Sequence, residues 1–237
     1  MEYRVIELLY KHKLGHLGSC LTMLPLVDHV YSVKKPNDIV VLSAGHAGVA
    51  LYAALEKYEG HNAEELLERH GVHPNRDLEH GIYVSTGSLG SGILVAVGYA
   101  IADRSRDVYV LLTDGECAEG SVWEALAFAH NHKLKNLKVH VNVNGYSAYA
   151  PVNTWYLWFR LKAFLWSTNV WFTKPPKVAF LEGLKAHYHV INQEDKDKLN
   201  QIINEEDVRG NVARGDGQES SAVSANWRSW LRYFGPN

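Results

Sequence analysis

The sequence predicts an α/β fold, built as a doubly wound, mostly parallel sheet with helices on both faces. Residues 107–112 (DVYVLL) are continuously apolar, which is typical of a parallel strand that is buried on both sides. A helical segment at 119–132 and an apolar strand at 137–143 follow it. Together they form a βαβ unit, whose crossover is right-handed in about 98% of cases. Residues 38–42 (DIVVL) have the composition of a further buried strand.

The segments around these strands supply the helices that the fold class requires. Helical patterns occur at 2–14, 21–33, 47–58, 62–70, 91–102 and 194–204, with a turn at 15–19 and Asn62 as an expected N-cap. The helix at 91–102 is small and apolar, so we expect it to be buried. Residues 71–92 indicate a loop that ends in a glycine cluster, and residues 170–173 a short strand.

The C-terminal part of the chain is organised differently. We expect residues 1–205 to form one domain and residues 206–237 to form a flexible polar linker with an aromatic tail. Residues 208–226 are rich in glycine, serine and polar residues, a composition that favours flexibility. Aromatic residues are concentrated at 155–172, where they could fill a core or form an interface with a partner.

Composition excludes several classes of function. The chain has 237 residues and a formal net charge of -2, so it lacks the basic field that nucleic acid attracts. Its two cysteines, Cys20 and Cys117, are too few for a disulfide framework and suit a reducing, cytoplasmic compartment. The sequence contains no apolar run of the ~18 residues that a membrane span requires.

Two polar residues follow neighbouring strands of the predicted sheet. Thr113 and Asp114 follow the strand at 107–112, and Asn144 follows the strand at 137–143. Carboxyl ends of parallel strands are where open α/β sheets bind ligands. A carboxylate, an amide oxygen and a backbone carbonyl form a hard oxygen set that suits Mg²⁺ or Ca²⁺ and not zinc. Taken singly, Asp-Gly and Asn-Gly are ordinary turn sequences, but their spacing across a βαβ unit favours a site.

The helical segment at 119–132 predicts that the same site binds an anion. A helix that begins at Glu119 presents its N-terminus near the same edge of the sheet, where backbone N–H groups attract negative charge. Mg²⁺ keeps few protein ligands and takes phosphate oxygens for the others. Metal and helix together predict a diphosphate.

At this point the sequence resembles a known family. Residues 113–145 (TDGECAEGSVWEALAFAHNHKLKNLKVHVNVNG) resemble the thiamine diphosphate motif of transketolases, Gly-Asp-Gly followed by a distant Asn. Four other segments match family motifs in order, at 14–26 (LGHLGSCLTMLPL), 41–55 (VLSAGHAGVALYAAL), 72–102 and 173–190. The resemblance covers residues 1–148 well and residues 172–205 weakly. It implies a thiamine diphosphate-binding fold.

The resemblance implies a role for each matching residue. Asp114 and Asn144 would be metal ligands, with the carbonyl of Tyr146 as the third protein ligand. The cofactor contacts would come from Gly115 at the diphosphate, Gly87 and Leu89 at the aminopyrimidine ring, and His46 and His187 at the diphosphate or thiazolium side. Glu119 would lie at a subunit interface, in a carboxylate network that links paired sites.

Four histidines are the candidate catalytic side chains. By resemblance, His16 and His73 would face the hydroxyls of the sugar substrate and assist proton transfer, beside His46 and His187. Histidine suits this work because its ordinary pKa is about 6.5. His16 and His46 lie in turns beside glycine. His73 could instead be a surface loop residue, and His189 is an alternative to His187.

The chain also departs from the family pattern. Thr113, Ala44 and Ser88 replace a glycine, an asparagine and a proline, and Pro175-Pro176 replaces a Lys-Gly-Lys-Gly stretch. The segment between the third strand and residue 173 is short, so the domain is expected to be truncated relative to that of a full transketolase.

No segment resembles the family's pyrimidine-binding domain. We therefore expect an N-terminal subunit of a split, transketolase-like transferase that moves a two-carbon ketol unit between sugar phosphates. It would need thiamine diphosphate, Mg²⁺ or Ca²⁺ and a separate pyrimidine-domain partner, in an α₂β₂ assembly or around a homodimeric core, and would be inactive alone. Two alternatives stay open: a degenerate homologue that binds without catalysis, and a different thiamine diphosphate enzyme such as a 1-deoxyxylulose-5-phosphate synthase.

Overall fold

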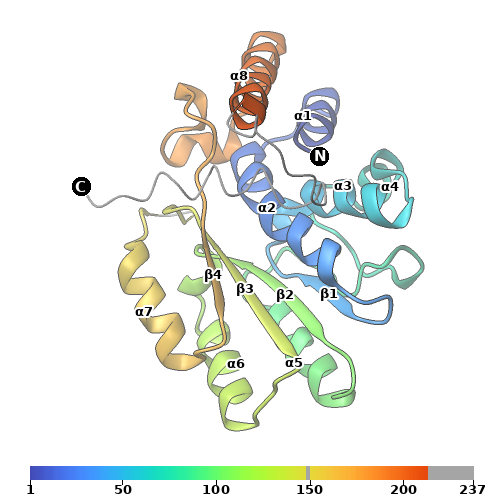
Figure 1. Cartoon of the computed structure of the whole chain (residues 1–237), viewed down its shortest axis with the longest axis vertical. Coiled ribbons are helices and arrows are strands. Elements are labelled where there is room, and N and C mark those ends of the chain that lie inside the picture. The colour runs from blue at the N-terminus through green and yellow to red at the C-terminus, as the bar shows by residue number, and fades with distance from the viewer. Residues whose placement is uncertain (148–149, 213–237) are drawn as a thin grey trace.

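A four-stranded parallel sheet forms the centre of the protein (Figure 1). The computed structural model describes residues 1–147 and 150–212. The strands are β1 (Ile39–Leu42), β2 (Val108–Thr113), β3 (Leu137–Val143) and β4 (Asn169–Phe172), and they lie in chain order across the sheet. Every neighbouring pair is parallel. The predicted α/β class, with a parallel sheet between helices, is confirmed.

Helices cover both faces of the sheet because each strand is apolar on both sides. One face carries α5 (Gly92–Ala102), α6 (Gly120–Asn131) and α7 (Thr154–Phe164), and the other carries α1 (Glu2–Lys11), α2 (Leu17–Val33) and α3 (Gly48–Glu59). Alternate residues of one strand point to opposite faces. In β1, Val40 packs in the core under α2 and α3, whereas Val41 packs in the core under α5 and α6.

Two further helices complete the face that carries α1, α2 and α3. These are α4 (Ala63–His70) and α8 (Gln193–Val212). The predicted cap of α4 is confirmed, since the Asn62 side chain accepts hydrogen bonds from the backbone N–H groups of Glu64 and Glu65. Within the described ranges, 1–147 and 150–212, no helix has both the length and the apolar character needed to cross a membrane.

The start of α2 differs from the prediction. The helix begins at Leu17 and includes Gly18, whereas the sequence predicts a turn that extends to residue 19. Leu17 and Cys20 are fully buried, and this burial outweighs the roughly 1 kcal/mol by which glycine disfavours a helix. His16, the N-cap, adopts the left-handed conformation, with a φ of 66°.

The expectation that the helix at 91–102 would be buried is wrong for one of its faces. In α5, Leu94, Val95 and Ile101 are between 39% and 47% exposed. The opposite face is buried against the sheet and consists of Ile93, Ala96, Val97 and Ala100. The helix therefore presents an apolar strip that no described part of this chain covers.

The aromatic segment forms α7 and β4; Trp171 and Phe172 pack against the core, but other aromatic side chains of the segment are exposed. In α7 only Leu157 and Leu161 are buried. Trp155 and Phe159, by contrast, are more than 60% exposed. The interpretation that residues 155–172 fill a core is therefore wrong for Trp155 and Phe159. The alternative, an interface with a partner, stays a prediction.

The C-terminal helix extends further than predicted. The expected helix at 194–204 is present, but α8 continues to Val212, so residues 208–212 belong to the helix. The side chain of Asn192 caps the helix by accepting a hydrogen bond from Asp195 N at 2.9 Å. Residues 213–237, with the aromatic tail, lie outside the described residues. The division of the chain at residue 205 stays a prediction.

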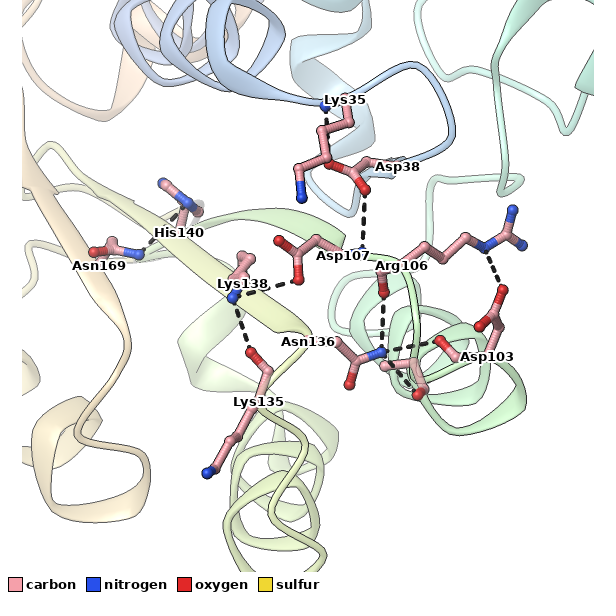
Figure 2. A network of polar contacts seen from close by, with 11 residues as sticks. Lys35, Asp38, Asp103, Arg106, Asp107, Lys135, Asn136, Lys138, His140 and Asn169 are labelled. Carbon is pink, nitrogen blue, oxygen red and sulfur yellow. Dashed lines mark hydrogen bonds and ion pairs between the residues drawn. The ribbon is translucent and has the colours of Figure 1, made fainter.

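Hydrogen bonds from buried side chains fix the amino ends of the strands (Figure 2). The amide nitrogen of Asn136 donates to the carbonyl oxygens of Ala100, Asp103 and Arg106 at 3.0–3.1 Å. It thereby ties the end of α5 to the chain that enters β2. The carboxylate of Asp38 accepts hydrogen bonds from the backbone N–H groups of Lys35 and Asp107 at 2.9 and 3.1 Å, and so ties β1 to β2.

Replacing Asn136 by alanine tests this network. The Asn136→Ala substitution leaves one buried and two partly buried carbonyl oxygens without this donor, and we expect it to lower the free energy of unfolding by about 1–3 kcal/mol. Urea denaturation measures the change. Asn131→Ala, at an exposed position of α6, is the control and should change stability by no more than about 0.5 kcal/mol. Equal effects of the two substitutions would contradict the role given to Asn136.

Candidate cofactor site

One cavity lies at the carboxyl ends of β1, β2 and β3. Its volume is about 320 Å³. All but one of the residues expected from the sequence line it, namely His16, His46, His73, Gly87, Leu89, Asp114, Gly115, Asn144, Tyr146 and His187. Glu119 is the exception; it occupies the N-cap position of α6, without a side-chain capping hydrogen bond, and lies outside the lining. The structure thus brings together residues that are more than 170 positions apart in the chain.

Asp114 and Asn144 are adjacent because β2 and β3 pair in register. Thr113 lies opposite Asn142, so the residues that follow the two strands meet at the same edge. The Asp114 carboxylate accepts hydrogen bonds from the backbone N–H groups of Asn144 and Gly145 at 3.0 and 2.7 Å. Burial raises the pKa of this carboxyl to about 7, and the backbone donors oppose the shift. A bound cation would favour the charged form further.

The side chain of Asn144 is held on the cavity wall. Its amide oxygen accepts a hydrogen bond from Tyr146 N at 3.0 Å, and its amide nitrogen donates to the Thr22 hydroxyl at 3.4 Å. Asn142 donates to the same hydroxyl at 3.0 Å. Thr22 in α2 therefore fixes the end of β3, a role that nothing in the sequence around Thr22 indicates.

Four histidines gather on one side of the cavity. The ring centroids of His16 and His187 are 4.4 Å apart, and His16 lies 6.0 Å from His46 and 6.2 Å from His73. The backbone N–H of His16 also donates to the carbonyl of His187 at 3.0 Å. The alternative residue, His189, instead contacts Asp195 with its Nε2 at 2.9 Å. This geometry favours His187 over His189 as a site residue.

Burial keeps two of these imidazoles neutral. It lowers the pKa of His46 to about 3 and that of His16 to about 4, and the neighbouring histidines lower both values further. Burial also lowers the pKa of His187. The cavity therefore offers neutral imidazoles, which can accept a hydrogen bond, at physiological pH.

The glycine loop at 87–92 forms another wall. Gly87 and Gly90 have φ values of +122° and +73°, which L side chains rarely adopt. A Cβ atom at Gly90 would lie 2.9 Å from the Cβ of Glu119, so the loop also packs tightly against the start of α6. Only glycine meets both requirements at this position.

Glu116 belongs to the surroundings of the site, but the sequence did not predict it. It is fully buried behind the wall, and its carboxylate accepts hydrogen bonds from Ser43 Oγ, Gly90 N and Thr113 N at 2.6, 3.1 and 3.2 Å. Burial raises its pKa to about 7. An acidic residue in a turn after a strand gives little indication of such burial, since turns are normally exposed.

The cavity suits a polar, anionic ligand that brings its own cation. His16 Nδ1 and Thr113 Oγ1 are buried at the wall without a hydrogen-bond partner. The oxygen atoms of Asp114 and Asn144 are hard donors. Among the described lining residues none is lysine or arginine, so these residues supply no fixed positive charge to balance a diphosphate.

Comparison with known proteins identifies the family. The model of the transketolase thiamine diphosphate binding domain matches residues 3–170. The chain belongs to the transketolase family. The resemblance noted in the sequence is thereby confirmed, and the matched region is the family's thiamine diphosphate binding domain.

Relatives in the transketolase family include both long and short chains. The chain is 35% identical over 162 residues to one subunit of the apulose-4-phosphate transketolase of Phocaeicola vulgatus, a match that covers 60% of this chain and 57% of the relative. It is 40% identical over 161 residues to human transketolase, which covers 58% of this chain and 26% of the human protein. The matches thus span little more than half, or less, of the relatives' own length.

A solved structure supports the same fold. Transketolase from Leishmania mexicana superposes with a TM-score of 0.65 and 21% identity, covering 98% of this chain and 43% of that protein. At 21% identity, this similarity supports the fold alone.

The titration of the cavity histidines is a direct test of the site's electrostatics. NMR should find His46 and His16 neutral down to pH values near 3 and 4. Between these values and about 6.5 the unfolded chain binds protons that the folded chain does not, so both groups destabilise the fold as the pH falls. His46→Gln and His16→Gln assign the resonances. Titration of both near pH 6.5 would contradict the buried environment.

Proposed function

We propose that this chain is the N-terminal subunit of a split, transketolase-like enzyme that transfers a two-carbon ketol unit between sugar phosphates. The observation that carries the proposal is the Asp114–Asn144 pair, which shares one cavity with His16, His46 and His187. The pair provides a place for a metal ion, and the histidines provide groups for proton transfer.

In this proposal, some residues of the cavity wall bind the metal ion and others bind the cofactor. Asp114, Asn144 and the carbonyl of Tyr146 hold Mg²⁺ or Ca²⁺, which balances the charge of the diphosphate. The cofactor contacts are those of Gly115, His46 and His187 on the diphosphate or thiazolium side and of Gly87 and Leu89 on the aminopyrimidine side. Thiamine diphosphate supplies the carbanion chemistry when it is bound, and the protein supplies orientation and electrostatics.

The proposed task of the histidines is to move protons of the sugar. Breaking the C2–C3 bond of a ketol donor requires that a hydroxyl group lose its proton. His16 and His73 line the cavity from different segments of the chain and are proposed to take this proton. The low pKa of His16 keeps it neutral and able to accept a hydrogen bond from the hydroxyl.

The partner is proposed to be a separately encoded pyrimidine-domain chain, in an α₂β₂ assembly. Two relatives are named as transketolase subunits, the apulose-4-phosphate protein and the 6-deoxy-6-sulfo-D-fructose transketolase subunit SqwG of a Clostridium species, at 34% identity over 160 residues. The exposed apolar strip of α5 begins next to the glycine loop, where such a chain could close the cavity. Glu119 lies at the same edge and is proposed to reach the interface. Both cysteines are buried and free, in keeping with a reducing, cytoplasmic location.

A degenerate, non-catalytic subunit is the second candidate. The observation that favours it is Thr113, whose side chain stands on the cavity wall where the family has glycine. Thr113 could restrict the approach of the diphosphate to the backbone. The two candidates differ in whether the loaded complex turns over a ketose phosphate.

Calorimetric titration of thiamine diphosphate with Mg²⁺ tests the cofactor site, with the chain alone and with its partner. Asp114→Asn removes the negative charge from the proposed ligand pair and should weaken binding by about a hundredfold or more, equivalent to ~2.7 kcal/mol. Asp107→Asn, the same substitution at the amino end of β2, is the control and should leave binding unchanged. Unchanged affinity in Asp114→Asn would refute the ligand assignment, and an absence of binding by the wild-type complex would refute the proposed function.

The α5 strip gives a prediction about the partner. Leu94→Glu places a charge in the proposed interface and should weaken association with the pyrimidine-domain chain by about tenfold or more, because the charge would be desolvated. Leu78→Glu changes a similarly exposed leucine outside the cavity and should have no effect. Sedimentation of mixtures of the two chains measures the association. An equal response of both variants would argue against α5 as the interface.

A further inference from the structure

Glu116 joins three segments that are far apart in the sequence. Ser43 lies at the end of β1, Gly90 lies in the glycine loop, and Thr113 is the last residue of β2. Each donates one hydrogen bond to the Glu116 carboxylate. One oxygen accepts from Ser43 and Gly90, and the other accepts from Thr113.

The same three segments carry the proposed cofactor contacts. His46 follows Ser43 by three residues, Gly87 and Leu89 precede Gly90, and Asp114 follows Thr113. Glu116 itself does not line the cavity. Glu116 is therefore placed to set the spacing of the groups that would contact the ligand. It would not contact the ligand itself.

We propose that Glu116 is a positioning residue that clamps the three segments of the cavity wall at the separation that thiamine diphosphate requires. This inference rests on the proposed function for the identity of the ligand. The clamp itself is a property of the chain and can be tested without a ligand.

Two of the three segments also pack closely against each other behind the wall. A Cβ atom at Gly92 would lie 2.7 Å from the Cα of Ser43, and one at Gly45 would overlap with the hydroxyl of Thr86. These two segments therefore approach each other through glycine. The buried carboxylate is the group that all three reach.

A glutamine cannot replace this carboxylate. The clamp needs two acceptor oxygens, because Gly90 and Thr113 present backbone N–H donors to different oxygens of the group. In Glu116→Gln the amide NH₂ would face one of these donors whichever way it turned. At least one buried N–H would then lose its partner.

Asp38 offers a matched control at the other end of the sheet. It is also buried, and its carboxylate also accepts two backbone N–H groups, those of Lys35 and Asp107 (Figure 2). Asp38→Asn should cause the same kind of loss in the fold without reaching the cavity. If Glu116 served only the stability of the fold, Glu116→Gln and Asp38→Asn would give equal results.

Hydrogen exchange of the chain without ligand is the first measurement. In the wild type the amides of Gly90 and Thr113 should exchange slowly; exchange as fast as in an open loop would overturn the clamp, whatever the variants do. Glu116→Gln should speed exchange at 43–48, 86–92 and 113–118 by about tenfold or more, whereas Asp38→Asn should speed exchange only near 35–39 and 107. Equal patterns in the two variants would also overturn the proposal.

Binding of thiamine diphosphate with Mg²⁺ is the second measurement, on the complex with the partner. Glu116→Gln should weaken binding by about ten- to a hundredfold and Asp38→Asn should not. If Glu116→Gln does not fold, Glu116→Asp, which keeps the charge and shortens the reach, takes its place and should weaken binding in the same direction. Wild-type affinity in the folded variant would refute the positioning role. If the wild type itself does not bind, the proposed function fails, and the exchange experiment still decides the clamp.

Discussion

The in-register pairing of β2 with β3 is the constraint on which the candidate site depends. It places Thr113 opposite Asn142, so the chain leaves both strands at the same level of the sheet. The backbone N–H groups of Asn144 and Gly145 can then reach the Asp114 carboxylate. A shift of one residue in this register would move Asn144 by about 3.3 Å along the sheet from Asp114 and would exchange the side chains that pack on the two faces. The same packing that buries the core therefore also sets the geometry of the site.

Burial determines the charges in and behind the cavity wall. It raises the pKa of Asp114 in the wall and of Glu116 behind it to about 7, and it lowers that of His46 to about 3. Of the described lining residues none is lysine or arginine. An anionic ligand would thus find hydrogen-bond donors and neutral imidazoles but no fixed positive charge, which explains why the proposed site depends on a metal ion. The exposed strip of α5 at the same edge accords with a cavity that a second chain completes.

The features that could be predicted from the sequence are those that follow from strand ends and turn residues. Asp114 and Asn144 could be placed together because parallel strands end at one edge, and His16 and His46 could be selected because glycine accompanies them in turns. The exposure of α5 was missed because a uniformly apolar helix has no polar face to indicate its orientation. Glu116 and Thr22 were missed because their contacts with Ser43 and Asn142 span 73 and 120 residues, and no local pattern records such contacts.

A crystal structure of the complex with thiamine diphosphate and Mn²⁺ in place of Mg²⁺ tests the central claim most directly. The anomalous signal of Mn²⁺ locates the metal independently of the protein atoms. The account predicts a single peak within coordination distance of the side-chain oxygens of Asp114 and Asn144 and of the carbonyl oxygen of Tyr146. A peak elsewhere in the chain, or a diphosphate bound without contact to Asp114 and Asn144, would contradict it.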